Sequence, residues 1–234
     1  MSKPLIVIEG DSWERLPNFG AKSLPIVGGT GYDLGRGLED LGYPVENIAY
    51  WGDTIAEIWR IKDYRRALRD TGAKHFLLGG GGNDLLGEGR LQTFLRLYEK
   101  GRKTEDYFKP GFYKALDDVM DTYKLILHDV YDRPEFRDVT VIVHGYDYAK
   151  PMKLGWIGEP MAMQGIDEYH PKLQDALVKY MIDHFNERLA DLRRYWPKLV
   201  HVDFRGMVKG RWHDELHPRK EAFVDLALHL SQSI

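Results

Sequence analysis

A serine in a turn of small residues stands close to the N-terminus of the chain. Gly10-Asp11-Ser12 follows the apolar residues 4–8 with only Glu9 between, so we expect the serine hydroxyl at the carboxyl end of a first strand. A serine hydroxyl is a weak nucleophile until a base removes its proton. The same turn is also typical of a helix N-cap. We expect a helix to begin at Ser12 or just after it, and its positive end would favour a developing alkoxide.

A candidate base, and an acid to orient it, stand near the C-terminus, where Asp214 precedes His217 by three residues. In a turn, this spacing lets the carboxylate reach the imidazole ring and fix its tautomer. Pro218 suits the first position of a helix, so His217 would lie at a helix start, where the dipole lowers its pKa. Two other interpretations stay open. In the first, Asp214 only caps the helix, and His213 and His217 are surface residues. In the second, His213, Asp214 and His217 hold zinc, although no further ligand cluster accompanies them.

Two further turns follow expected strands and carry hydrogen-bond donors. The glycine run at residues 79–82 ends in Asn83, whose side-chain amide can donate. Gly52 follows another apolar run, and its backbone N–H can point to the same edge of the sheet. The alternative for both segments is a plain turn.

Glycines also raise nucleotide binding as an alternative function. The run at residues 79–82 lacks the Gly-Lys-Ser/Thr ending of a phosphate loop. Gly29-Thr30-Gly31, with Gly35 behind it, has the wrong spacing for a dinucleotide loop. We interpret this second segment as a glycine-rich loop that borders the site.

The elements that must position these residues follow from the hydrophobic pattern. Short continuous apolar runs alternate with longer amphipathic segments, which is typical of strands buried on both faces of a parallel sheet. The expected strands are residues 5–8, 45–50, 75–78, 139–144 and 199–202. The expected helices are 54 to about 70, opened by a Thr54–Glu57 capping box, and 112–131, 173–196 and 218–230. This alternation predicts an α/β fold with a doubly wound sheet, whose ligands bind beyond the carboxyl ends of the strands.

Two segments do not fit the alternation. Residues 85–111 are polar with scattered apolar positions, and residues 146–171 are rich in Gly, Pro and Met. Both follow expected strands, so we expect them at the active edge as lid-like insertions in a single domain over residues 1–234.

Composition narrows the class of protein. The 234 residues are 43% hydrophobic and 29% charged with a formal charge of -3, which indicates neither nucleic acid nor a membrane surface as partner. The absence of cysteine excludes disulfides, thiolate metal sites and a cysteine nucleophile. We recognise neither a signal peptide nor a run of ~20 apolar residues, so we expect a cytoplasmic protein. No metal or cofactor is expected, and the sequence leaves homo-oligomers open.

Taken together, these motifs resemble the four blocks of the SGNH (GDSL-type) hydrolases. The blocks are Gly10-Asp11-Ser12, Gly52, Gly81-Gly82-Asn83-Asp84 and Asp214-x-x-His217, and they span nearly the whole chain in the family's order. The resemblance implies a flavodoxin-like, three-layer α/β/α sandwich with a five-stranded parallel sheet in the order 2-1-3-4-5.

The resemblance also implies the role of each residue. Ser12 is the nucleophile, His217 the base, and Asp214 the residue that orients His217. The oxyanion hole is formed by the Ser12 and Gly52 backbone N–H groups and the Asn83 amide. Two neighbours of the serine depart from the family pattern, since Trp13 stands where leucine is common and Glu9 precedes the glycine.

The function predicted from this resemblance is hydrolysis of small or short-acyl carboxylic esters through an acyl-enzyme. We expect a small-molecule substrate and a pocket walled by Trp13, Tyr146, Tyr148 and Trp156. A carbohydrate O-acetyl esterase is the alternative, because aromatic faces also suit sugars. A catalytically silent binding module on the same fold is an alternative of another class.

Overall fold

Five strands form one parallel sheet in this computed structural model, which describes residues 2–16 and 31–234. They are β1 (Ile6–Glu9), β2 (Val45–Asn47), β3 (His75–Leu78), β4 (Thr140–His144) and β5 (Leu199–Val202). Their order is β2-β1-β3-β4-β5, which confirms the predicted order and the α/β class. In register, Ile8 pairs with Leu77, and Leu77 pairs with Ile142.

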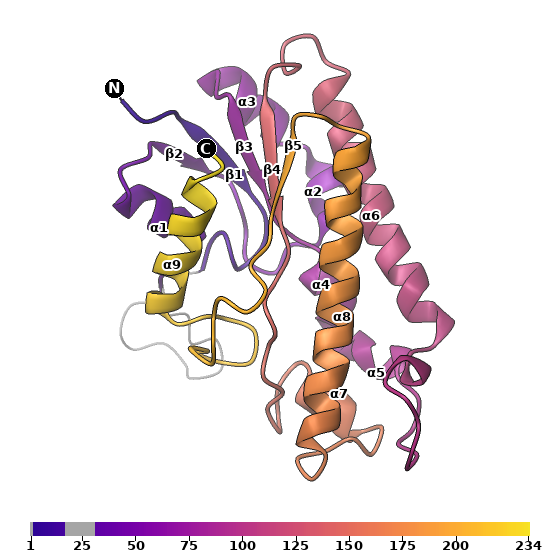
Figure 1. The fold of residues 1–234 in the computed structure, drawn as a ribbon. Coiled ribbons are helices and arrows are strands. Elements are labelled where there is room, and N and C mark those ends of the chain that lie inside the picture. Colours follow the sequence, from indigo (N-terminus) through magenta and orange to yellow (C-terminus); the bar gives the residue numbers. More distant parts are fainter. Residues whose placement is uncertain (1, 17–30) are drawn as a thin grey trace.

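Helices cover both faces of the sheet and complete three layers (Figure 1). On one face lie α1 (Leu34–Asp40) and α9 (Lys220–Ser231), which pack against each other. On the other face lie α2 (Ile55–Ile61), α3 (Tyr64–Thr71), α6 (Pro110–Tyr131) and α8 (Pro171–Asp191). Val141, Ile142 and Val143 of β4 are fully buried, because this inner strand has helices on both faces of the sheet.

Several helices begin or end where the sequence did not predict. The Thr54–Glu57 capping box is confirmed, but the expected helix breaks at Lys62, whose φ of 58° is left-handed, and resumes as α3. The C-terminal helix begins at Lys220 rather than at Pro218, because Pro218 pairs with Trp212 in a β-bridge. No helix begins at Ser12, since the described residues after it form a single turn.

The two segments that interrupt the alternation lie beyond the carboxyl ends of the strands, at the lower end of Figure 1. The first begins within α4 (Gly82–Leu86) and contains η1 (Gly87–Gly89), α5 (Arg90–Phe94) and η2 (Glu105–Tyr107). The second contains α7 (Gly158–Ala162). The two segments touch, since the N–H of Tyr98 donates to the carbonyl of Gln164 at 2.7 Å. Their role as a lid stays a prediction, as does the single domain.

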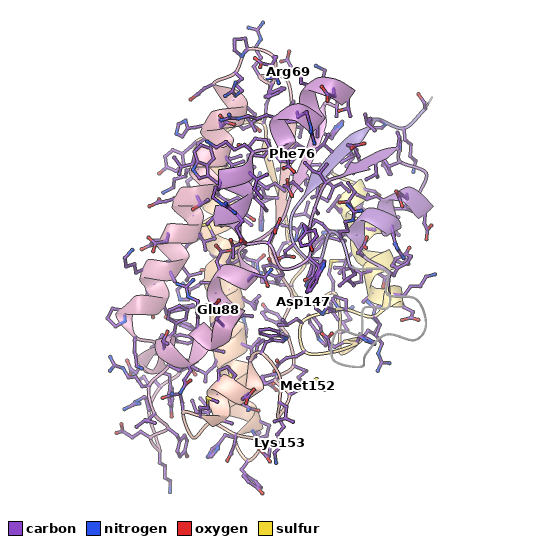
Figure 2. The ribbon with its side chains drawn as sticks, turned by 180° about the vertical axis from the view of Figure 1, so that it is seen from behind. Arg69, Phe76, Glu88, Asp147, Met152 and Lys153 are labelled. Carbon is purple, nitrogen blue, oxygen red and sulfur yellow. The ribbon has the colours of Figure 1, made fainter. Side chains whose placement is uncertain are left out.

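Figure 2 shows the same arrangement from behind, with Phe76 in the sheet, Asp147 below it, and Met152 and Lys153 at the far end of the molecule. The segment after β4 therefore leads away from the sheet toward the rim of the carboxyl edge. Among the described helices, none combines the length and the apolar character needed to cross a membrane.

Candidate active site

Ser12, His217 and Asp214 form a continuous chain of hydrogen bonds at the carboxyl edge of the sheet. The Nε2 atom of His217 lies 2.9 Å from the Oγ atom of Ser12. Its Nδ1 atom lies 2.9 Å and 3.0 Å from the two carboxylate oxygens of Asp214. A carboxylate only accepts, so Nδ1 carries the proton and Nε2 is left to accept the proton of the serine. The ring is thereby held in the tautomer that a general base requires.

The turn between Trp212 and Pro218 positions the base. The N–H of His213 donates to the carbonyl of His217 at 2.8 Å, and Trp212 and Pro218 form a β-bridge. Asp214 Oδ1 also accepts the backbone N–H of His217 at 2.8 Å. The expected placement of His217 at a helix start is therefore wrong, because α9 begins three residues later. The turn between Trp212 and Pro218, and no helix end, therefore positions His217.

Asp214 keeps its negative charge in this turn. Burial alone would raise its pKa, but hydrogen bonds from the His217 ring and from the N–H groups of Leu216 and His217 lower the pKa below its usual value. An ionised Asp214 both fixes the ring of His217 and stabilises the imidazolium that forms when the base takes a proton.

The turn that carries Ser12 is closed by two carboxylates. Asp11 Oδ1 accepts the N–H of Trp13 at 2.9 Å, and Glu14 Oε2 accepts the N–H of Asp11 at 3.0 Å. Because this is one turn and no helix, the expected contribution of a helix dipole at Ser12 is wrong. The indole N–H of Trp13 donates to the carbonyl of Leu216 at 3.0 Å, so the serine turn is tied directly to the turn of the base.

Trp13 does not wall a pocket, which corrects the sequence prediction. Its side chain is 3% exposed and belongs to the core. The indole ring packs within an aromatic cluster made of His144, Tyr146, Phe204, Trp212 and Phe223. Trp13 therefore fills the aromatic core and also links the Ser12 turn to the turn of the base through its bond to Leu216.

A buried ion pair lies beneath the serine turn, and sequence reasoning missed it. Glu14 and His144 are both fully buried, and the Glu14 carboxylate contacts the Nε2 atom of His144. His144 Nδ1 donates to the carbonyl of Gly145 at 2.8 Å. Burial alone would lower the pKa of His144, but the facing Glu14 carboxylate raises it. A Cβ atom at Gly10 or at Gly79 would collide with the Glu14 carboxylate, so both positions need glycine.

The candidate oxyanion donors are Gly52, on the turn after β2, and Asn83, in the first turn of α4, and these two segments are bonded to each other. Gly52 has a φ of 88°, a left-handed conformation that suits glycine. The side-chain amide of Asn83 donates to the carbonyl of Asp53 at 2.9 Å, and the N–H of Ile55 donates to Asp84 Oδ2 at 2.9 Å. An amide NH₂ has two hydrogens, so this bond orients Asn83 and requires only one of them.

The predicted pocket residues after β4 have different surroundings. Tyr146 is half-buried, and its hydroxyl bonds to Asp11 Oδ2 at 2.6 Å and to the N–H of Gly82 at 3.0 Å. The hydroxyl of Tyr148 donates to Asp183 on α8 at 2.8 Å. The side chain of Trp156 is 57% exposed. Of the three, Trp156 has the most surface free for a substrate.

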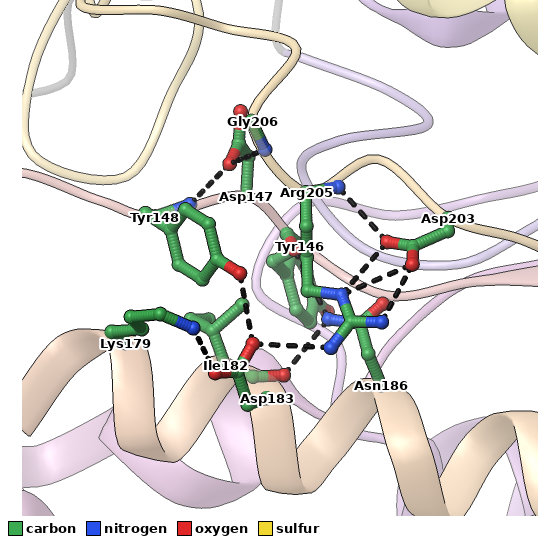
Figure 3. A network of polar contacts seen from close by, with 10 residues as sticks. All are labelled: Tyr146, Asp147, Tyr148, Lys179, Ile182, Asp183, Asn186, Asp203, Arg205 and Gly206. Atoms are coloured by element: carbon green, nitrogen blue, oxygen red, sulfur yellow. Dashed lines mark hydrogen bonds and ion pairs between the residues drawn. The ribbon is translucent and has the colours of Figure 1, made fainter.

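Polar contacts fix the segments after β4 and β5 against α8 (Figure 3). Asp147 is buried, and its carboxylate accepts the N–H groups of Tyr148, Gly206 and Val208, each at 2.6 Å. Arg205 bonds to Asp183 on α8 at 3.0 Å. These contacts set the path of the chain that leads from β5 to the turn of the base.

A second buried carboxylate, Glu215, anchors the rim. Its Oε1 atom accepts the N–H groups of Met152 and Gly158, and its Oε2 atom accepts the N–H of Ile157, each at 2.7 Å. Glu215 follows Asp214 directly, so residues 152–158 are fastened to the turn of the base. This segment carries the exposed apolar side chains Met152, Leu154 and Trp156.

A cavity of about 290 Å³ lies beside the turn after β2, lined by Glu9, Ile48, Tyr50, Asp53, Ile58, Ile61 and Asp63. Burial, together with a hydrogen bond and the charge of Asp63, raises the pKa of Glu9 to about 10. Burial and the charge of Glu57 raise the pKa of Asp53 to about 6. The residue before Gly10, which departs from the family pattern, is therefore a neutral carboxyl group at pH 7.

Among its described residues, the glycine-rich segment near residue 30 forms no phosphate-binding turn. Gly29 and Thr30 lie outside the described residues. Gly35 lies within α1, and a Cβ atom there would collide with the Asn47 amide, so packing explains this glycine.

Comparisons with solved structures identify the fold. Neither a family model nor a curated protein sequence matches the chain. An extracellular lipase from Streptomyces rimosus matches with a TM-score of 0.62 and 15% identity, over 99% of this chain and 100% of that chain. The acetylxylan esterase Axe2 from Geobacillus stearothermophilus matches with a TM-score of 0.56 and 14% identity, over 99% and 94%. A protein named GDSL-like lipase, from Parabacteroides merdae, matches with a TM-score of 0.50 and 11% identity, over 99% and 95%.

The chain has the fold of the SGNH (GDSL-type) hydrolases. The predicted resemblance is thus confirmed at the level of the fold. In this SGNH fold, Ser12 and Gly52 lie on turns after β1 and β2, and Asn83 lies in α4, which follows β3. His217 lies on the longer connection between β5 and α9. A fold alone does not determine function, which depends on the chemistry of these residues.

Proposed function

We propose that this protein hydrolyses carboxylic esters through an acyl-enzyme formed on Ser12. The observation that carries the proposal is the chain Ser12–His217–Asp214, with 2.9 Å between serine oxygen and imidazole nitrogen. His217 takes the proton of Ser12 as the serine oxygen attacks the ester carbonyl. The protonated ring then gives this proton to the leaving alcohol. A water molecule, activated by the same ring, releases the acid and restores the serine.

The oxyanion of the tetrahedral intermediate would be stabilised by the backbone N–H groups of Ser12 and Gly52 and by the amide of Asn83. Such donors contribute most when they are fixed before the reaction begins. The bond from Asn83 to the carbonyl of Asp53 and the left-handed backbone of Gly52 support this role.

The comparison with Axe2 supports the assignment of the three residues. Variants of that acetylxylan esterase with alanine in place of a serine, an aspartate or a histidine are described as catalytic mutants. Its aspartate and histidine stand three residues apart, as Asp214 and His217 do here.

Small or short-acyl esters are the proposed substrates, and one observation favours acetylated carbohydrates as the alternative. Tyr50 and Trp51 directly precede Gly52, and their rings stack with centroids 6.1 Å apart. Tyr50 is 59% exposed and Trp51 is 39% exposed. Exposed aromatic faces next to a proposed oxyanion donor suit the apolar face of a sugar ring. The cytoplasmic location stays a prediction, since one protein of this fold is an extracellular lipase.

A graded substrate panel tests the proposal. The panel combines p-nitrophenyl esters of increasing acyl length with acetylated xylo-oligosaccharides, and Ser12→Ala is the control. We expect turnover by the wild type that falls with acyl length and is absent in Ser12→Ala. Faster release of acetate from the oligosaccharides than from p-nitrophenyl acetate would favour the carbohydrate esterase. Absence of turnover on every member would favour the silent binding module.

A further inference from the structure

The hydroxyl of Tyr146 joins the Ser12 turn to the start of α4, two segments that the proposed reaction uses. It bonds to Asp11 Oδ2 at 2.6 Å and to the N–H of Gly82 at 3.0 Å. Asp11 directly precedes Ser12, and Gly82 directly precedes Asn83. One oxygen atom therefore connects the residue before the proposed nucleophile to the residue before the proposed oxyanion donor.

The direction of both hydrogen bonds follows from the chemistry of the groups. A backbone N–H only donates, so the hydroxyl of Tyr146 accepts from Gly82 and gives its own hydrogen to Asp11. Burial and the charge of Asp11 raise the pKa of Tyr146 well above its usual value, so the hydroxyl stays a neutral donor. The other carboxylate oxygen of Asp11 accepts the N–H of Trp13 at 2.9 Å, which carries the constraint across Ser12.

The ring that bears this hydroxyl has little freedom to move. It packs edge-on against Trp13 with centroids 5.2 Å apart, and it lies 5.5 Å from the ring of Phe185. A Cβ atom at Gly82 would lie 3.0 Å from Tyr146 Cζ, so the glycine permits the close approach. The backbone carbonyl of Tyr146 accepts from the Asn186 amide of α8 at 3.2 Å, a contact drawn in Figure 3.

We propose that Tyr146 is a positioning residue, whose hydroxyl holds the Ser12 turn and the start of α4, which carries Asn83, at the separation that the transition state of acylation requires. This inference rests on the proposed function. A displacement of about 1 Å between reacting groups can cost about 10²-fold in rate. An effect confined to the transition state lowers kcat and leaves KM nearly unchanged.

A second consequence concerns the charge of Asp11. Around it stand titratable groups from several elements: Glu14, Asp53, Asp84, Tyr123, His144 and Tyr146. Burial and the charge of Glu14 raise the pKa of Asp11 to about 6, against hydrogen bonds from the Trp13 N–H and the Tyr146 hydroxyl, which lower it. Removal of the hydroxyl raises this pKa further, so Asp11 takes up a proton at a higher pH. The acid limb of the kcat profile should then move to higher pH.

The test compares Tyr146→Phe with Tyr64→Phe on p-nitrophenyl acetate over a range of pH. Tyr64 is a matched control, because its fully buried side chain also donates to an aspartate, Asp129, at 2.8 Å, between α3 and α6. We expect Tyr146→Phe to lower kcat by about 10- to 100-fold with KM within about twofold. Its acid limb should move to higher pH. Tyr64→Phe should leave kcat and its pH profile as in the wild type.

Equal kinetics and pH profiles in the two variants would overturn the inference, as would a change in KM alone. Amide hydrogen exchange measured by NMR adds a readout that needs no ester. The N–H of Gly82 should exchange faster in Tyr146→Phe than in the wild type or in Tyr64→Phe. Unchanged exchange at Gly82 would also overturn the inference, even if the wild type hydrolysed no ester and the proposed function itself failed.

Discussion

The Nε2 atom of His217 lies 2.9 Å from the Oγ atom of Ser12, although 205 positions of sequence separate the two residues. The contact does not stand alone, because the indole N–H of Trp13 donates to the carbonyl of Leu216 at 3.0 Å. Neighbours of the serine and of the histidine are thus bonded as well. This double link positions the base without a helix at either residue.

Asp214→Asn should leave the turn intact and remove the function of the base. The oxygen of asparagine can still accept the backbone N–H groups of Leu216 and His217, which Asp214 Oδ1 binds at 2.8 Å. Its amide would face Nδ1 as a donor and favour the wrong tautomer of the ring. We expect kcat on p-nitrophenyl acetate to fall by about 10⁴-fold, as in other triads of this type. A loss smaller than tenfold, with the variant folded, would argue against Asp214 as the orienting acid.

Asn83→Ala tests the oxyanion assignment. Loss of one such donor typically lowers kcat by about 10²–10³-fold, and we expect KM to stay within a few-fold because the donor acts mainly in the transition state. Steady-state kinetics measure the two constants, and a thermal unfolding curve shows whether the turn bonded to Asp53 is retained. Turnover within a few-fold of wild type would remove Asn83 from the oxyanion hole.

The strand pattern predicted the α/β class, and the family resemblance carried by the four motifs implied the sheet order and the pairing of Ser12 with His217. The apolar residues 76–78 are fully buried, as expected for a strand that is covered on both faces of a parallel sheet. The predicted helix starts at Ser12 and Pro218 were wrong. Pro218 pairs with Trp212 in a β-bridge, and at Ser12 a local turn forms in which the Asp11 carboxylate accepts the N–H of Trp13.

Contacts between distant side chains could not be predicted from sequence. Nothing in the spacing of Glu14 and His144, which stand 130 positions apart, indicates that they pair. The contacts of the Tyr146 hydroxyl were likewise not predicted, because an aromatic residue near a strand end suggested only a pocket wall. In the sequence, the buried Glu14 carboxylate is reflected only in the glycines at positions 10 and 79. The need for glycine there becomes clear only in the structure, where the Glu14 carboxylate lies against both residues.

Glu9→Gln should stabilise the fold, and more so at higher pH. The pKa of Glu9 is raised from 4.5 to about 10. The contribution of Glu9 to the stability of the fold is therefore fully present below pH 4.5 and is lost as the pH rises toward 10. Glutamine cannot ionise, yet its oxygen can still accept the N–H of Gly10, which Glu9 binds at 3.0 Å. The gain in Tm over wild type should grow between about pH 5 and pH 9. A gain independent of pH would contradict the raised pKa.

Glu215→Ala should release the rim segment at residues 152–158. Three backbone N–H groups lose their acceptor, and each would cost about 1–3 kcal/mol if it stayed buried. We therefore expect faster hydrogen exchange in this segment, measured by mass spectrometry, with β3 unchanged. Glu168→Ala is the matched control, since Glu168 pairs with Lys153 of the same segment at the surface. Equal exchange in both variants would mean that Glu215 does not anchor the rim.

Covalent labelling most directly tests whether His217 activates Ser12 as the nucleophile. A fluorophosphonate reacts with a serine whose proton a neighbouring base removes, whatever the natural ester is. Intact mass spectrometry should show one label per wild-type chain and none on Ser12→Ala, with the label mapped to the peptide that contains Ser12. A folded wild-type protein that takes up no label, or a label that persists in Ser12→Ala, would contradict the assignment of Ser12 as the nucleophile.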